Sequence, residues 1–178
     1  TGKGHYGEGD VFLGIMVPES RKLALKYHEL PLTDISKLIK NKYHEARLVA
    51  LLILVHKYNS FSKQYFLRHA LRTDRFQLPG QSASREKVFV LKKKTEIYKF
   101  YLAHTKYINN WDLVDLSAGY IVGNYLHQRT VLKRASPRTV LEKLAKSKDL
   151  WERRIAIIST FAFIYKGESE WTFRIVKM

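Results

Sequence analysis

The sequence contains no cysteine, no apolar run long enough to cross a membrane and half as many acidic residues as basic ones. Without cysteine there is no disulfide framework, no thiolate zinc site and no cysteine nucleophile. A membrane-spanning helix needs about 18 consecutive apolar residues, whereas the longest apolar run here extends only from Leu48 to Val55. We therefore expect no membrane partner.

Metal and triad patterns are also missing. The seven histidines are scattered, and none forms an H-E-x-x-H or a comparable metal-ligand spacing. The serines and threonines lack the surroundings of a catalytic triad. We therefore expect no metal ion and no cofactor.

The charge is strongly one-sided. Lys and Arg number 32 against 16 acidic residues, which gives a net charge of +16 over 178 residues. Such an excess of positive charge predicts a polyanionic partner. Nucleic acid is the first candidate and an anionic membrane surface the second. The length and the 46% hydrophobic content are typical of one globular domain with a core of its own. We expect a monomer.

Apolar residues recur at helical spacing through most of the chain. Thr33 is the expected cap of a short helix, and Asp149 the cap of a longer one, since both residue types accept backbone N–H groups at helix starts. Gly119 and Gly123 are expected to let two helices approach closely. The predicted helices cover residues 19–28, 33–40, 43–58, 88–105, 110–127, 150–165 and 168–178, and another begins at Pro137. No stretch is a convincing strand.

The helix pairs repeat. Residues 44–50 align with residues 151–157, and 40 residues separate Trp111 from Trp151, close to the period of HEAT and armadillo repeats. We therefore predict an all-α fold, a right-handed α-α superhelix of HEAT-like helix pairs. Its second helices would line a concave face. On that face Arg47, Asp115 and Arg154 are expected to approach one another.

Two segments fall outside this pattern. Residues 1–10 are rich in glycine, and we interpret them as a flexible approach to the first helix. Residues 61–86 are basic and contain the loop-like Pro79-Gly80, so we interpret them as a long surface insertion. Two interpretations of the insertion remain open: an additional phosphate-binding arm, or a tolerated insertion without a function.

The segment around Trp111 carries the strongest functional signal. Asn110 suits a helix N-cap and Asp112 the first turn. Asp115 lies past that turn, where aspartate has poor helix propensity. Trp111 and Asp115 are four residues apart and so share one helix face. Taken alone, this pair also fits a core tryptophan beside an ordinary surface ion pair.

Four stretches point to a known family. They are residues 9–21, residues 44–54, residues 107–115 with the pattern W-D-x-x-D, and residues 150–157. In order and spacing they resemble the AlkD-type DNA alkylation-repair glycosylases, a family built of HEAT-like repeats. The resemblance covers most of the chain outside the insertion. It implies one HEAT-like domain over residues 1–178, incomplete at both ends relative to the family.

This resemblance implies an activity, the hydrolysis of the N-glycosidic bond of N3- and N7-alkylated purines in duplex DNA. Asp115 matches the acidic residue of the family's site, and Trp111 the aromatic that packs on the sugar of the damaged nucleotide. Arg154 matches the site arginine, with Arg153 as the adjacent alternative. Whether the damaged base is flipped out of the duplex stays open.

The partner expected from this reading is double-stranded DNA with alkylated bases. Arg47, Arg153, Lys106 and Tyr27 are the expected DNA contacts. No signal peptide is recognisable, so we expect a cytoplasmic, nucleoid-associated protein. Two alternatives remain: a non-catalytic HEAT-repeat protein that binds distorted or branched DNA, and a HEAT scaffold for an acidic protein partner.

Overall fold

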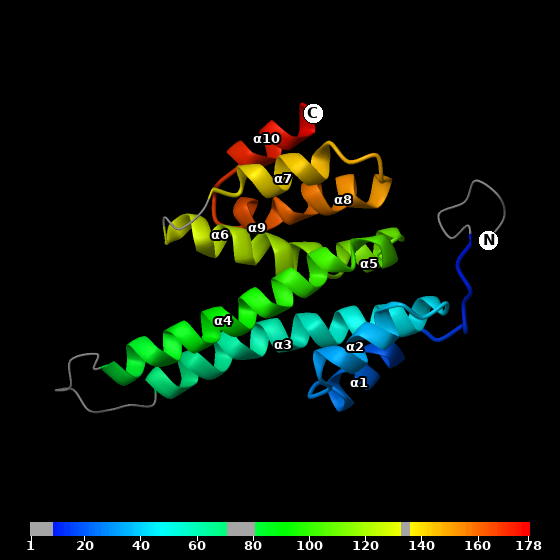
Figure 1. Ribbon diagram of the computed structural model, residues 1–178, viewed down its shortest axis with the longest axis horizontal. Helices are drawn as coiled ribbons and strands as arrows, with labels where there is room; N and C mark the ends of the chain where they lie inside the picture. Colours follow the sequence, from blue (N-terminus) through cyan, green and yellow to red (C-terminus); the bar gives the residue numbers. More distant parts are fainter. Residues whose placement is uncertain (1–8, 71–80, 133–135) are drawn as a thin grey trace.

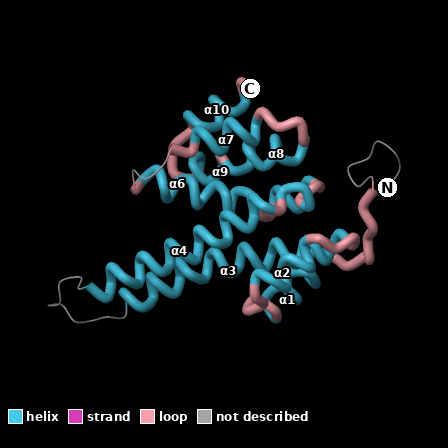
Figure 2. The backbone as a smooth tube through the Cα atoms, viewed as in Figure 1, coloured by secondary structure: helices cyan, strands magenta, loops and turns pink. Residues whose placement is uncertain are grey.

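The computed structural model describes residues 9–70, 81–132 and 136–178, with side chains for 9–61, 85–132 and 136–178. In these residues every regular element is a helix (Figures 1 and 2), which confirms the predicted all-α class. Val11 and Tyr43 pair in an isolated parallel β-bridge. None of the described helices has both the length and the apolar content that a membrane crossing requires.

The first helices pack together as predicted. α1 (Val17–Lys26) and α2 (Leu32–Ile39) both lie against α3 (His44–Ala70). Pro18 falls in the first turn of α1, where its missing N–H costs no hydrogen bond. The prediction that Thr33 caps α2 is wrong, because Pro31 occupies the N-cap position and no side chain caps that helix end.

The predicted insertion is mostly helical. α3 continues to Ala70, and α4 (Gln81–Ala103) already begins at Gln81. The two helices pack side by side and form a long hairpin that projects from the body (Figures 1 and 2). Residues 61–70 and 81–86, which were expected to belong to a surface insertion, are therefore parts of α3 and α4. Residues 71–80, like the glycine-rich residues 1–8, lie outside the described part.

The predicted helix at 110–127 is interrupted. After the short helix η1 (Thr105–Tyr107) come α5 (Trp111–Asp115), the π-helical turn η2 (Gly119–Gly123) and α6 (Asn124–Val131). The Ser117 hydroxyl donates to the Leu113 carbonyl four residues earlier, a contact that bends helices. In the π turn the N–H of Asn124 reaches back five residues to the carbonyl of Gly119.

Gly123 allows close contact between neighbouring helices. A Cβ atom at this position would lie 2.3 Å from the Ser159 carbonyl oxygen and 2.8 Å from the Ala162 Cβ. No side chain fits there. At Gly119 the nearest atom, the Ile158 carbonyl oxygen, would be 3.4 Å away. The predicted close approach is confirmed, and Gly123 is the residue that requires it.

The last helices are α7 (Arg138–Ala145), α8 (Leu150–Ser159), α9 (Phe161–Ile164) and α10 (Glu170–Val176). Asp149 caps α8 as predicted, since its carboxylate accepts the Trp151 N–H at 2.7 Å. The expected continuous helix 150–165 divides at Thr160, whose hydroxyl donates to the Ile157 carbonyl at 2.7 Å.

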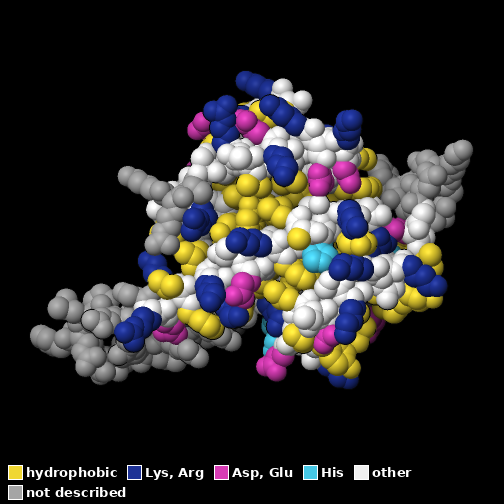
Figure 3. Space-filling model, in the orientation of Figure 1, with side chains coloured by type: hydrophobic (Ala, Val, Ile, Leu, Met, Phe, Trp, Pro, Cys, Tyr) yellow, Lys and Arg dark blue, Asp and Glu magenta, His cyan; other side chains and the backbone are white. Residues whose placement is uncertain are grey.

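The second helices of the pairs lie next to one another. η2 contacts both α3 and α8, and α5 also contacts both. Figure 1 shows α3, the α5–η2–α6 segment and α8–α9 as successive layers. This stacking agrees with HEAT-like pairs, while the handedness of a superhelix stays a prediction. Lys and Arg side chains are spread over the face in Figure 3 rather than gathered in one patch.

Candidate functional site

Asp115 and Arg154 form a two-pronged ion pair. The Nε of Arg154 donates to Oδ1 of Asp115 at 2.7 Å, and its Nη2 donates to Oδ2 at 2.7 Å. Asp115 ends α5 and Arg154 lies in the first half of α8. The Asp115 and Arg154 side chains are 32% and 39% exposed, respectively. The predicted approach of these two residues is confirmed, and it places a fixed carboxylate at the protein surface.

Trp111 is exposed beside this pair. It is the first residue of α5, one turn before Asp115, and 49% of its surface is accessible. The alternative in which Trp111 is a core residue is therefore wrong. An exposed indole and an exposed carboxylate share one helix face, where both can meet the same ligand.

Arg153 points elsewhere. Its Nη1 donates to the backbone carbonyls of Ser147, at 2.9 Å, and Lys148, at 3.0 Å. These carbonyls follow α7, so Arg153 ties the α7–α8 connection to α8. Of the two adjacent arginines, Arg154 is the one that faces Asp115.

Arg47 is buried, unlike the half-exposed Asp115 and Arg154. It is only 6% exposed, and its guanidinium donates to the Asp10 carboxylate and to the Asn109 side-chain oxygen. The hydrogen bonds of Arg47 go to Asp10 and Asn109, whereas Asp115 pairs with Arg154. The chain before α1 folds over the start of α3 and brings Asp10 next to Arg47. In this arrangement the guanidinium is not available to a phosphate.

His44 completes this buried network. Its Nδ1 lies 3.2 Å from an Asp10 carboxylate oxygen and its Nε2 lies 2.7 Å from Asp112. Burial lowers the pKa of His44, but the contacts with Asp112 and Asp10 outweigh it and the net pKa is raised. Asn110 occupies the predicted N-cap of α5, yet its side chain donates to Asp10 at 2.9 Å rather than capping. The network anchors the start of α5, and with it Trp111.

Glu45 fixes the chain before α1 in a similar way. Its carboxylate accepts the backbone N–H groups of Leu13, Gly14 and Ile15 at 2.9 to 3.3 Å. Burial opposes ionisation, but these N–H groups hold the pKa of Glu45 below its ordinary value. Gly14 has φ of 79°, a conformation that glycine adopts without strain. Sequence reasoning missed this role for Glu45.

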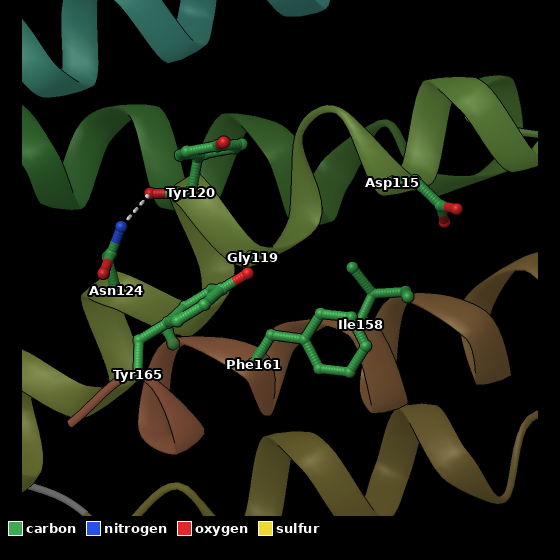
Figure 4. Close-up of a pocket in the computed structure, with 8 residues that line it drawn as sticks. Asp115, Gly119, Tyr120, Asn124, Ile158, Phe161 and Tyr165 are labelled. Atoms are coloured by element: carbon green, nitrogen blue, oxygen red, sulfur yellow. Dashed lines mark hydrogen bonds between the residues drawn. The ribbon is translucent and has the colours of Figure 1, made fainter. Parts of the chain in front are cut away.

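A hollow opens next to Asp115, between the η2–α6 segment and α8–α9 (Figure 4). Its cavity volume is about 140 Å³. Asp115 lies at one end and Asn124 at the other, with aromatic rings between them (Figure 4). Sequence reasoning missed this hollow as well. It is lined by Asp115, Gly119, Tyr120, Asn124, Ile158, Phe161, Ala162 and Tyr165.

Comparison with known families gives one match. A family model described as "DNA alkylation repair enzyme" matches residues 2–178. The chain belongs to the DNA alkylation repair enzyme family. Neither the curated proteins nor the solved structures contain a match to it. Family membership confirms the resemblance seen in the sequence and makes DNA the partner of this repair enzyme.

Three of the expected DNA contacts of this repair-family protein are exposed, and Arg153 is one of them. Tyr27 follows α1, is 46% exposed and has the Lys26 Nζ 5.3 Å from its ring centroid. Lys106 is exposed on η1, with its Nζ 4.8 Å from the Tyr107 ring centroid. Their contact with DNA stays a prediction.

Among the described residues, no three His, Asp or Glu side chains come together in a way that would hold a metal ion. The candidate site consists of the ion pair, the exposed indole and the hollow.

Proposed function

We propose that this DNA alkylation repair enzyme is a glycosylase that hydrolyses the N-glycosidic bond of N3- and N7-alkylated purines in duplex DNA. The observation that carries the proposal is Asp115, a surface carboxylate held in one orientation by Arg154 and one helical turn from the exposed Trp111. A HEAT scaffold for an acidic protein has no use for a carboxylate displayed in this way.

The chemistry needs little from the protein. A purine alkylated at N7 or N3 is cationic and leaves as a neutral base when its bond to C1′ of the deoxyribose breaks. Positive charge then develops on the sugar. A preorganised carboxylate stabilises that charge where it forms. Water adds its oxygen to C1′ and releases a proton, and Asp115 is placed to orient that water and accept the proton.

Arg154 and Trp111 have complementary roles in this proposal. Both carboxylate oxygens of Asp115 are taken by the guanidinium. A DNA phosphate competes for the same guanidinium, since planar bidentate geometry suits phosphate as well as carboxylate. When the phosphate draws Arg154 away, the charge of Asp115 faces the sugar. The Trp111 face adds an attraction for that cation of about 0.5–2 kcal/mol.

The net charge of +16 supplies binding that does not depend on sequence. Lys and Arg contacts to phosphates set the position of a protein on the duplex without reading bases. Exposed residues such as Lys106 and Tyr27 are assigned this role here. Arg47 is left out of the set because it is buried in its pair with Asp10.

A second candidate is a non-catalytic protein that binds distorted or branched DNA. The closed state of the ion pair favours it, because Asp115 has both oxygens occupied by Arg154. In that case Arg154 still meets phosphate, while Asp115 serves only to orient it. The two candidates differ in one observable, the release of a free base.

The test is incubation with duplex DNA that carries 7-methylguanine, followed by measurement of the free base. We expect release by the wild-type protein and none above background by Asp115→Asn. The control is Asp34→Asn, which removes another half-exposed carboxylate paired with a basic residue, Lys37, at 2.8 Å. DNA binding without release would support the second candidate. Absence of salt-sensitive DNA binding would reject both, because phosphate contacts weaken steeply as salt rises.

A further inference from the structure

Trp111 is held between two residues that are themselves tied to the rest of the protein. Before it, the side-chain amide of Asn110 donates to Asp10 at 2.9 Å. After it, a carboxylate oxygen of Asp112 lies 2.7 Å from Nε2 of His44. The indole itself is half exposed. Its direction therefore depends on the backbone at the start of α5, and both ties lead to the chain before α1 and the start of α3.

His44 lies between two carboxylates and faces one with each ring nitrogen. Its Nδ1 is 3.2 Å from an oxygen of Asp10, and its Nε2 is 2.7 Å from an oxygen of Asp112. An ionised carboxylate can only accept hydrogen bonds, and a neutral imidazole has a single N–H to donate. Both hydrogen bonds therefore exist together only when both ring nitrogens carry a proton. The His44 side chain is 4% exposed, so water does not replace a lost bond.

Neighbouring charged groups do not replace His44 at Asp112. The Arg47 guanidinium donates to Asp10, and the Glu45 carboxylate accepts backbone N–H groups of the chain before α1. Within the described part of the chain, Asp112 forms an ion pair with His44 alone, whereas Asp10 pairs with both His44 and Arg47. Burial lowers the pKa of His44, but its contacts with Asp112 and Asp10 outweigh burial and raise the net pKa. The second proton is therefore kept to a higher pH than in an exposed histidine.

We propose that His44, with both ring nitrogens protonated, is a positioning residue that fixes Trp111 for contact with the damaged nucleotide. The inference rests on the proposed function and adds a pH-dependent control of it. His44 is too buried to touch the DNA and acts through Asp112 and Asp10. When it loses a proton, one ring nitrogen presents a lone pair to a carboxylate, and that contact becomes repulsive. The start of α5 then loses one of its ties, and Trp111 turns away from the face that it shares with Asp115.

The first test follows the indole itself and needs no substrate. In the full chain with Trp151→Phe and Trp171→Phe, Trp111 is the only tryptophan that remains. Its fluorescence anisotropy is measured from pH 6 to 9, with and without the further substitution His44→Gln. We expect the anisotropy to fall as the pH rises through the pKa of His44. In His44→Gln it should be low at every pH, because a neutral side chain replaces the imidazolium ion.

His127→Gln is the matched control for this measurement. His127 also lies beside a carboxylate, that of Glu168 at 3.2 Å, but on α6 and outside the network. It should keep the pH curve of the parent protein. An anisotropy that does not change with pH, or that His44→Gln leaves as it was, overturns the proposal. Should His44→Gln fail to fold, Asp112→Asn takes its place. Its amide oxygen accepts from a neutral ring, so the pH dependence should disappear there too.

The second test separates positioning from stability. Single-turnover release of 7-methylguanine is measured for His44→Gln, Trp111→Ala and the double variant. We expect His44→Gln alone to lower the rate by no more than Trp111→Ala does, about 2- to 30-fold. In the Trp111→Ala background it should have no further effect, because residues that act as one unit are not additive. Losses that add in full overturn the proposal. Anisotropy as expected without any base release keeps the positioning by His44 and rejects the glycosylase.

Discussion

Arg154 engages both carboxylate oxygens of Asp115, through two hydrogen bonds of 2.7 Å each. The pair joins α5 to α8 across 39 residues of sequence. It also shields the one carboxylate that the proposed reaction needs. Binding of DNA and exposure of that carboxylate are thereby linked, because the guanidinium is the partner that phosphate takes.

Breaking this pair is expected to cost little stability. Both side chains are about a third exposed or more, and ion pairs of that kind contribute about 1 kcal/mol or less. Arg154→Ala should therefore lower the free energy of unfolding by less than about 1 kcal/mol in urea denaturation. Arg47→Ala is the contrasting variant, since it takes the guanidinium from a buried Asp10 carboxylate that then keeps only Asn110 and His44, and it should cost more, up to about 3–5 kcal/mol. Equal losses in the two variants would contradict the assignment.

Trp111→Ala is expected to weaken catalysis without unfolding the protein, because the indole is half exposed. Loss of its contact with the cationic sugar, worth about 0.5–2 kcal/mol, corresponds to a decrease in kcat/KM of roughly 2- to 30-fold. Trp111→Phe should recover part of the loss. Phe89→Ala, another exposed aromatic, should leave kcat/KM unchanged. A Trp111→Ala variant with wild-type kcat/KM would remove Trp111 from the site.

His44 is expected to make stability depend on pH. Contacts with Asp112 and Asp10 outweigh burial and raise its pKa above the ordinary value of 6.5. The folded state therefore holds the proton more tightly than the unfolded state. This contribution is fully present below pH 6.5 and is lost as the pH rises through the folded pKa.

The measurement is the free energy of unfolding from pH 6 to 9, for wild type and His44→Gln. Wild type should lose stability as the pH rises through this window, and His44→Gln should lose less. Asp10 does not affect the comparison in this pH range. Burial opposes its ionisation, but Asn110, Arg47 and His44 hold its pKa below the ordinary value of 3.8. Its contribution to the free energy of unfolding is therefore lost only in acid. Parallel profiles for the two proteins would contradict a protonated His44.

Gly123→Ala is expected to destabilise the fold. The new Cβ would meet the Ser159 carbonyl oxygen at 2.3 Å and the Ala162 Cβ at 2.8 Å, and backbone must move to relieve this overlap. Overpacking of this kind costs about 1–3 kcal/mol. Gly119→Ala is the matched control, since its Cβ would come no closer than 3.4 Å to the Ile158 carbonyl. Thermal melting compares the two, and an unchanged Tm in Gly123→Ala would contradict the close packing.

Helical periodicity and the repeat register were sufficient to predict most helices and the meeting of Asp115 with Arg154. Both rest on local spacing, which fixes the face of a helix. The lengths of the helices were harder to predict from the sequence. Pro79-Gly80 and a polar composition suggested a loop, but packing of α3 against α4 extends both helices toward residues 71–80. Tertiary contact overrides local composition there.

The parts that sequence reasoning missed depend on distant partners. Arg47 has the spacing of a surface arginine, and only the folded position of Asp10 shows why it is buried. Tyr120 lines the hollow because of a π turn, which no propensity scale indicates. Phe161 and Tyr165 have the apolar spacing of core residues, yet both are exposed. The burial or exposure of each of these residues depends on tertiary contacts and not on the local sequence pattern.

The most direct measurement is the single-turnover rate of 7-methylguanine release, with protein in excess over the damaged duplex. At saturation this rate reports the chemical step and not the affinity for DNA. The account predicts that Asp115→Asn lowers the rate by at least about 100-fold, the cost of removing one preorganised electrostatic group, while DNA binding remains. Release by Asp115→Asn at the wild-type rate would show that Asp115 has no part in the chemical step.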